Sequence, residues 1–418
     1  MKKNNRKQRK DDKEKVNKIS DVKMAYIMYW KKVFIIPIII AIILGAVIWG
    51  IVYNARKNNA PQETADNQKE QVNYIWGEIK PGKRNTNNFT TVRSSDGVDV
   101  PVPTGYTASS ASDENSVRGG FVIYEGTEAV TDSNKWEAQC NRNQYVWIPI
   151  ANVSDMYWRN QTTGKKYGTT YTFNSSSYSK SSSNKKEPQT TKHDIQSTYL
   201  TQYLNGMSRE DFLMEMEIDF DKMLNSVATY GGYYIGRYQT GDLSQATPVV
   251  KRMNTDIGDQ NWWQMWKKAR KLTGTSAGAQ MIWGIQWDET MKWLIDTGEK
   301  TYAEVGSDST SWGIYYNNSF TYYTNTSKST ATKAKDNSTR IPSGAYEGAN
   351  ANNVFDLAGN VYDWTLESDG SGTGFYRYGR GGGFYDYGSY SPVANRDGDD
   401  GPFYSYDDYG LRCALYIK

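Results

Sequence analysis

The chain of 418 residues has little cysteine and almost no histidine. Its only cysteines are Cys140 and Cys413, and its only histidine is His193. Two cysteines cannot build a dense disulfide framework. They either form one bridge or remain small buried apolar residues, and we expect them to be unpaired. His193 lies in a polar stretch and is interpreted as an exposed bystander, and without clusters of these residues no zinc or copper site is expected.

Acidic residues are scarce at the N-terminus. Residues 1–32 carry twelve lysines and arginines against four acids, whereas the whole chain has a net charge of only +3. The remainder is therefore mildly acidic, and its charge does not favour nucleic-acid binding. Residues 1–32 are interpreted as a basic cytoplasmic segment, since a position beside anionic lipids explains their charge better than contact with nucleic acid does.

Charged residues are absent from residues 33–53, which read VFIIPIIIAIILGAVIWGIVY. About 20 apolar residues cross the core of a bilayer, so Val33–Tyr53 is predicted to be a transmembrane signal anchor. A cleavable signal peptide is the alternative, but the residues that follow, NARKNNAP, contain no convincing cleavage site. The positive-inside rule keeps the N-terminus in the cytoplasm and leaves the C-terminal domain extracellular.

The remainder is divided into a stalk and lead-in, residues 54–97, and one α+β domain, residues 98–418. Short apolar runs at 120–124 and 145–150 are predicted to be core strands. Ser, Thr, Tyr, Asn and Lys dominate the region near 155–200. We expect a low-complexity surface insertion there, partly disordered.

Three helices are predicted in the second half of the chain. The first begins at a capping box formed by Ser208 and Asp211, and it ends before a Gly-Gly turn into the strand sequence YYIGRY. The other two carry aromatic stripes that are more typical of a core than of a ligand site. These stripes are Trp262, Trp266 and Ala269, and Trp287, Met291 and Leu294.

Three motifs follow in order: DLAGNVYDW at Asp356–Trp364, RGGGF at Arg380–Phe384, and the ending YGLRCALYIK. This order resembles the C-terminal core of the formylglycine-generating enzyme (sulfatase-modifying factor) family, which has GNVWEW-type and RGGSW-type turns and a GFR-type strand. The upstream YYIGRY resembles that family's FYIGKYEVT-type segment. The resemblance implies a C-type-lectin-like fold, but a shared fold does not imply shared chemistry.

The residues that the family's oxidase chemistry needs are missing. The resemblance places a copper-binding cysteine pair shortly after the RGGSW-type turn, but residues 381–396 contain no cysteine. Cys413 falls in the terminal strand instead. Without two thiolates a soft Cu(I) site is not available, and the related iron-dependent members need histidines. We therefore expect no copper, iron or zinc and a protein that is not an enzyme.

Four residues of the first turn resemble a calcium site of the family: Asp356, Gly359, Val361 and Asp363. Carboxylate and backbone oxygens suit Ca²⁺, and its role would be structural. Asp363 stands where the family usually has glutamate, which shortens this ligand by one methylene. A plain Gly-Asn turn, in which Asp356 bonds to its own loop, explains the same residues.

The segment after RGGGF is rich in Tyr, Asp, Ser and Gly, the composition of an antibody-like contact surface. This composition also resembles the variable region of proteins diversified by diversity-generating retroelements, although tyrosine is frequent in the whole chain (33 residues). The predicted ligand-binding residues are Tyr385, Asp386, Tyr387, Ser389, Tyr390, Asp397, Asp399, Tyr404, Tyr406 and Asp408.

The sequence thus predicts a bacterial, membrane-anchored cell-surface protein of the receptor or adhesin type. Its partner would be an extracellular protein or glycan, bound by a non-catalytic lectin-like domain that is a target of a diversity-generating retroelement. Two alternatives remain open. One is a divergent formylglycine-generating oxidase, and the other is a structural envelope protein whose polar loops bind nothing specific.

Overall fold

The computed structural model describes residues 78–418, apart from 273, 275, 371–373 and 399. The predicted basic segment, the predicted span Val33–Tyr53 and most of the predicted stalk lie outside the described residues. Among the helices of the described part, none is long and apolar enough to cross a membrane.

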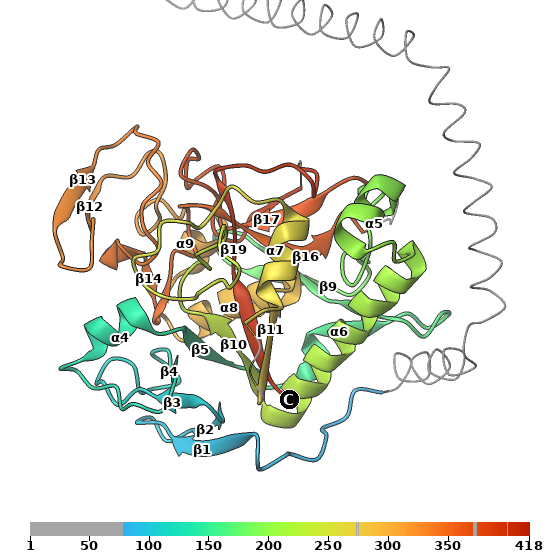
Figure 1. Ribbon diagram of the computed structural model, residues 1–418, viewed down its shortest axis with the longest axis horizontal. Coiled ribbons are helices and arrows are strands. Elements are labelled where there is room, and N and C mark those ends of the chain that lie inside the picture. The colour runs from blue at the N-terminus through green and yellow to red at the C-terminus, as the bar shows by residue number, and fades with distance from the viewer. Residues whose placement is uncertain (1–77, 273, 275, 371–373, 399) are drawn as a thin grey trace, which may run out of the picture. The chain divides into compact units, whose positions relative to one another are not determined.

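A six-stranded sheet forms the centre of the domain (Figure 1). Its strand order is β11-β20-β10-β5-β4-β3, and every neighbouring pair is antiparallel. Strand β20 (Cys413–Ile417) lies between β11 (Ala277–Met281) and β10 (Gly232–Gly236), so the C-terminus enters the middle of the sheet. The other strands are β5 (Gln144–Pro149), β4 (Val122–Glu125) and β3 (Tyr106–Ala108), and the first two confirm the predicted core strands.

The three predicted helices are present as α6 (Arg209–Tyr230), α7 (Trp262–Ala269) and α8 (Gly284–Asp296). Ser208 caps α6 by accepting a hydrogen bond from the Asp211 backbone N–H at 3.0 Å. Gly231 ends the helix with φ +85°, a left-handed conformation that glycine adopts without strain. The C-terminus lies beside the end of α6 (Figure 1), where the Tyr230 hydroxyl donates to the Lys418 carbonyl.

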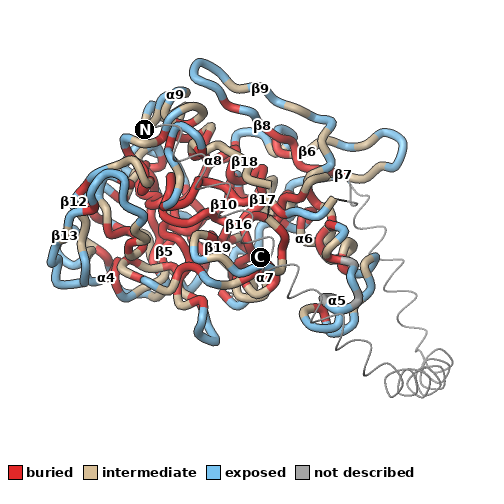
Figure 2. The backbone as a smooth tube through the Cα atoms, turned by 90° about the horizontal axis from the view of Figure 1, so that it is seen from above, coloured by how far each residue is buried: buried red, intermediate tan, exposed pale blue. Residues whose placement is uncertain are grey.

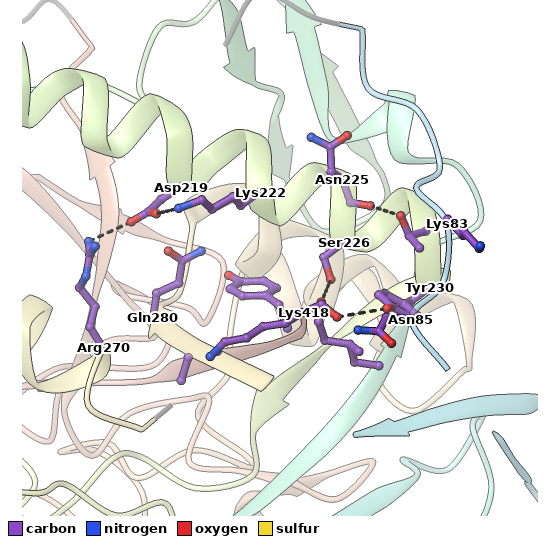
Figure 3. A pocket seen from close by; sticks show the side chains of 15 residues that line it. Lys83, Asn85, Asp219, Lys222, Asn225, Ser226, Tyr230, Arg270, Gln280 and Lys418 are labelled. Carbon is purple, nitrogen blue, oxygen red and sulfur yellow. Dashed lines mark hydrogen bonds and ion pairs between the residues drawn. The ribbon is translucent and has the colours of Figure 1, made fainter. Parts of the chain in front are cut away.

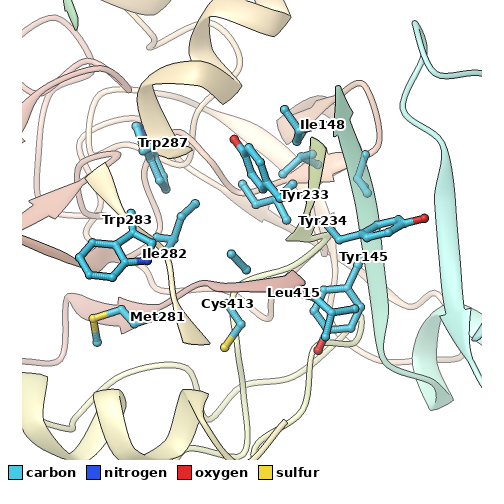
Figure 4. Close-up of a cluster of buried hydrophobic side chains, with 14 of the residues drawn as sticks. Tyr145, Ile148, Tyr233, Tyr234, Met281, Ile282, Trp283, Trp287, Cys413 and Leu415 are labelled. Atoms are coloured by element: carbon cyan, nitrogen blue, oxygen red, sulfur yellow. The ribbon is translucent and has the colours of Figure 1, made fainter. Parts of the chain in front are cut away.

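Aromatic side chains fill the space between the sheet and its helices. Figure 4 shows Trp283 and Trp287 on one side of the cluster and Tyr233, Tyr234 and Tyr145 on the other. Cys413 is part of this core, and both cysteines are free and buried, which confirms that they are unpaired.

A second, four-stranded sheet carries the sequence motifs. Its order is β18-β17-β16-β19, and only the β16–β19 pair is parallel. The DLAGNVYDW motif leads into β16 (Tyr362–Ser368), and RGGGF follows β17 (Arg377–Arg380). Gly381 and Gly382 have φ of +91° and +80°, which explains why the turn after β17 uses glycine. Strands β18 (Arg396–Asp397) and β19 (Tyr409–Leu411) come from the tail.

Short elements surround these two sheets, and Figure 2 shows strand β9 and the hairpin β12–β13 as largely exposed extensions of a buried interior. The hairpins are β1 (Phe89–Arg93) with β2 (Asp99–Pro103), β6 (Tyr157–Arg159) with β7 (Lys166–Gly168), β8 (Thr170–Phe173) with β9 (Tyr178–Ser181), β12 (Phe320–Tyr323) with β13 (Thr330–Lys333), and β14 (Asn350–Ala351) with β15 (Val354–Phe355). The remaining helices are α4 (Lys135–Asn141), α5 (Ser197–Leu204), α9 (Tyr302–Gly306), and the 3₁₀ turns η1 (Val153–Asp155), η2 (His193–Ile195) and η3 (Glu347–Ala349).

Much of the predicted loose surface insertion near residues 155–200 is buried instead, including strand β7 and most of β8. Its tip near Asn174 is exposed, as expected, but Glu187 is fully buried. The Glu187 carboxylate accepts hydrogen bonds from the backbone N–H groups of Gly284 (2.7 Å) and Ile285 (2.6 Å). As the first N–H groups of helix α8, these donors have no partner within the helix. Glu187 satisfies them and so holds the insertion against the core.

Candidate functional site

The tail residues 385–408 connect β17 to β19 and contribute β18 on the way. They form the surface that we call the Tyr/Asp face. Four tyrosines stand out from it: Tyr390 is 82% exposed, Tyr404 53%, and Tyr385 and Tyr387 49% each. Large aromatic side chains are normally covered in a folded protein, so four exposed rings in one segment indicate a contact surface.

Buried anchors hold the exposed rings in place. Phe384 is buried with Ile257 and Val361, and Val393 is buried while its N–H donates to the Ser309 hydroxyl at 2.9 Å. The Tyr385 hydroxyl donates to Asp407 Oδ2 at 3.1 Å. This bond joins the two ends of the tail, so the Tyr/Asp face is one connected surface.

A row of aromatic rings leads from the surface into the core. The ring centroids of Tyr404 and Tyr406 are 6.0 Å apart, those of Tyr406 and Tyr409 are 5.6 Å apart, and Tyr409 lies 4.2 Å from Trp364. Edge and offset contacts of this kind stabilise aromatic pairs. The row therefore fixes the exposed Tyr404 to the base of the sheet.

The structure exposes half of the predicted contact residues. Tyr385, Tyr387, Ser389, Tyr390 and Tyr404 are exposed, while Asp386, Asp397, Tyr406 and Asp408 are half-buried and Asp399 lies outside the described residues. The prediction did not include Asp400, Asp407, Tyr409, or Tyr316 from an earlier loop, whose ring lies 5.5 Å from that of Tyr387. The Tyr/Asp composition of the tail could have indicated the first three, but no local signal indicates Tyr316.

Burial and neighbouring aspartates on this face raise the pKa of Asp408. Burial, together with the charges of Asp407, Asp386 and Asp400, raises the pKa of Asp408 to about 6. Burial and the nearby Asp400 also raise the pKa of the Tyr406 hydroxyl. Negative charge is thus concentrated beside the aromatic row.

A buried ionic network lies behind the Tyr/Asp face. Arg380 of the RGGGF turn donates to Asp288 Oδ1 at 2.8 Å, and Arg396 of β18 donates to Glu367 Oε1 at 2.8 Å and to Asp288. Both acids and Arg380 are fully buried. The network connects β17 and β18 to helix α8 and gives the face a rigid base.

The residues of the predicted calcium site fit a cation only in part. Oδ1 of Asp356 and Oδ1 of Asp363 are buried without a hydrogen-bond partner, and free carboxylate oxygens suit Ca²⁺. However, Arg412 already donates to Asp363 Oδ2 at 2.9 Å and to the Asp356 carbonyl at 3.0 Å, and the Gln239 amide donates to the Val361 carbonyl at 2.8 Å. Asp356 Oδ2 accepts from Ser343 and Gly344. Calcium binding stays a prediction.

The thiols are poorly placed for redox chemistry. Burial raises the pKa of Cys413 to about 12, so its thiol is protonated at neutral pH. Cys140 lies in α4, remote in sequence from the RGGGF turn, and burial raises its pKa too. Within the described ranges, no three His, Cys, Asp or Glu side chains are arranged to hold a metal ion.

His193 differs from the expectation of an exposed bystander. It is half-buried, and its ring lies 4.7 Å from Phe375 and 4.5 Å from Phe403. Burial lowers its pKa below the usual value. It therefore packs the insertion against the tail beside Tyr404.

A cavity of about 660 Å³ lies elsewhere, between helix α6, strands β11 and β20, and the lead-in (Figure 3). Lys418, Ser226 and Tyr230 approach one another at its wall, and Arg270, Asp219 and Lys222 form a chain of ion pairs. None of the predicted contact residues is among those that line it.

The two sheets, their helices and the glycine turns together define an α+β domain. Residues 108–417 match the sulfatase-modifying factor enzyme 1-like domain, and the chain belongs to this family. A comparison with curated proteins finds no match.

Two solved structures are distantly similar to the chain. The crystal structure of CarF has 15% identity and a TM-score of 0.28, and the match covers 45% of this chain and 87% of that one. Treponema denticola variable protein 1 has 14% identity and a TM-score of 0.23, with 78% and 92% covered. Both likenesses are too distant to bear on function.

Proposed function

We propose that this protein is a non-catalytic, membrane-anchored binding protein of the bacterial cell surface. Its Tyr/Asp face would bind an extracellular protein or glycan. The observation that supports this proposal is the set of four exposed tyrosines held on buried anchors. Rigid aromatic rings supply contact area at a small cost in conformational entropy, and neighbouring carboxylates and hydroxyls supply hydrogen bonds.

The oxidase alternative has less support. Residues 381–396 contain no cysteine, and the two thiols of the chain are buried. A structural envelope protein is a second alternative, but it does not account for exposed tyrosines on a rigid base, because such rings raise the risk of non-specific association.

The tail is also proposed to be diversified by a diversity-generating retroelement. Sequencing of the DNA that flanks the gene tests this. We expect a near-copy of the codons for Gly381–Cys413 that differs only at adenines, beside a reverse transcriptase gene. If neither is present, a fixed binding protein is the better interpretation.

Binding by the Tyr/Asp face is tested by alanine substitution. A ligand is first identified with glycan arrays and with extracellular proteins, using the full-length protein in a mild detergent. Tyr387→Ala together with Tyr406→Ala should weaken binding at least about tenfold, since central aromatic residues carry much of the binding energy of interfaces. Tyr322→Ala on the distant hairpin β12–β13 is the control, and unchanged binding in the double variant would refute this placement.

The proposed topology needs a separate test. Protease added to intact cells should remove the C-terminal domain and leave a fragment of the N-terminal segment protected inside. Full protection of the domain in intact, unpermeabilised cells would contradict a cell-surface location.

A further inference from the structure

The negative charge of the Tyr/Asp face has almost no internal compensation. Residues 385–408 contain six aspartates and a single basic residue, Arg396. The Arg396 guanidinium is directed to the core, where it pairs with Asp288 and Glu367. The cations described at its edges have other contacts: Arg340 pairs with Asp259 at 3.0 Å and donates to the Asp407 carbonyl, Lys186 contacts the Tyr378 hydroxyl at 2.8 Å, and Lys192 lies 4.8 Å from the Phe375 ring.

A buried hydroxyl points into the acidic part of this face. Tyr409 is only 2% exposed, and the Asp400 carboxylate lies near its hydroxyl. Its ring lies directly against Gly379. A Cβ added at this glycine would be only 2.6 Å from Tyr409 Cε1. Gly379 pairs in register with Asp397 of β18, and the Asp400 carbonyl accepts from the Arg377 N–H.

The hydroxyl of Tyr409 therefore faces Asp397 and Asp400, and both carboxylates, together with burial, raise its pKa. The buried hydroxyl and the two carboxylates thus lie at one place. A group that brings positive charge and hydrogen-bond donors to this place would compensate the charge of the carboxylates.

We infer that the Tyr/Asp face recognises a basic segment of a partner protein, whose arginine or lysine side chains enter between the tyrosine rings and the aspartates. A guanidinium donates bidentate hydrogen bonds to carboxylates and stacks on aromatic faces, so it matches both components of this surface. This inference rests on the proposed function and names its ligand class. A neutral glycan would donate hydroxyl hydrogen bonds to the aspartates but leave their charge uncompensated, and an acidic glycan would be repelled.

The probes are four fluorescent peptides of equal length: octa-arginine, octa-lysine, octa-glutamate and an uncharged Gly/Ser octamer. Anisotropy titrations use the full-length protein in detergent, at low and at physiological salt. We expect octa-arginine to bind more tightly than octa-lysine, and the other two not to bind. Affinity should fall as salt rises, because exposed charges are screened within about 10 Å at 0.1 M salt.

Asp400→Asn with Asp407→Asn removes two charges from the face with little change of shape. This variant should weaken octa-arginine binding at least about tenfold, the loss expected when two charge-assisted contacts become neutral ones. Glu128→Gln with Glu137→Gln removes two exposed acids elsewhere and serves as the matched control, with an expected change below about twofold.

Three outcomes would overturn the inference. The basic peptides fail to bind, they bind equally well to both double variants, or the control variant loses as much affinity as the test variant. In each case a ligand that binds wild-type protein but not the Tyr387→Ala, Tyr406→Ala variant would still support the proposed function. Charge recognition and ligand binding by the face are thus tested separately.

Discussion

Arg380 and Asp288 form a fully buried ion pair, with 2.8 Å between Arg380 Nη2 and Asp288 Oδ1. The arginine begins the RGGGF turn and the aspartate lies in helix α8. Asp288 also accepts from the Tyr171 N–H at 2.8 Å and from Arg396. One carboxylate therefore connects the turn, the tail and the insertion.

Asp288→Asn should destabilise the domain by about 3–5 kcal/mol, because it leaves Arg380 and Arg396 with Glu367 as the one remaining carboxylate of the network. Asp296→Asn is the control on the same helix. Its pair with Lys292 is solvent-exposed, and such pairs contribute about 0–1 kcal/mol. Urea unfolding of the two variants measures the difference, and equal effects would contradict the role of the network.

Glu289 should make stability fall as the pH rises. Burial raises its pKa to about 7 from 4.5, and the hydrogen bond that its carboxylate accepts from the Tyr171 hydroxyl at 3.0 Å opposes only part of this shift. Between these pH values the folded state holds a proton that the unfolded state has lost. The stabilisation is thus complete below about pH 4.5 and is lost as the pH rises to about 7.

The size of this effect is about 3 kcal/mol, since one pKa unit corresponds to about 1.4 kcal/mol. Other groups titrate in the same range, so the informative quantity is the difference between wild type and Glu289→Gln. We expect the unfolding free energies of wild type and Glu289→Gln to be similar below about pH 4.5. As the pH rises toward about 7, wild type should lose stability relative to the variant. Parallel curves would show that Glu289 titrates normally in the folded protein.

Calcium binding at the DLAGNVYDW turn predicts a rise in thermal stability. Millimolar Ca²⁺ should raise Tm by a few degrees relative to a chelator, as for any ligand that binds only the folded state. Asp356→Asn should abolish the rise, and Mg²⁺ should not replace Ca²⁺, because it demands a tighter octahedral site. An unchanged Tm in wild type would leave the Gly-Asn turn as the explanation of these residues.

Local patterns in the sequence predicted local structure well. Ser208 and Asp211 marked the start of α6, and the apolar runs marked β4 and β5, because caps and strands depend on neighbouring residues. The buried position of Glu187 was missed, since its partners Gly284 and Ile285 are about 97 residues away.

The candidate site also depends on contacts between residues that are far apart in the sequence. The composition of the tail predicted a contact surface, but the arrangement of Asp397 and Tyr409 around Gly379 depends on the pairing of four strands. Strand pairing over such distances is set by tertiary packing, which no local pattern records. The tyrosine that lies deepest, Tyr409, was therefore not among the predicted contact residues.

Gly379→Ala tests this arrangement directly. The new methyl group would lie 2.6 Å from Tyr409 Cε1 and 3.2 Å from Tyr362 Cβ, so the Tyr409 ring must move. Overpacking of this kind costs about 1–3 kcal/mol. Displacement of the ring should also weaken octa-arginine binding several-fold, because the aromatic rings would no longer lie beside Asp397 and Asp400.

Gly274→Ala is the matched control, since a Cβ there meets nothing within 4 Å, and it should change stability by less than about 0.5 kcal/mol. Urea unfolding and peptide titration are measured on both variants. If Gly379→Ala is as stable as Gly274→Ala and binds octa-arginine as wild type does, the Tyr409 ring does not lie over Gly379. A stable variant that has lost binding would instead show that the position of Tyr409 matters for recognition more than for folding.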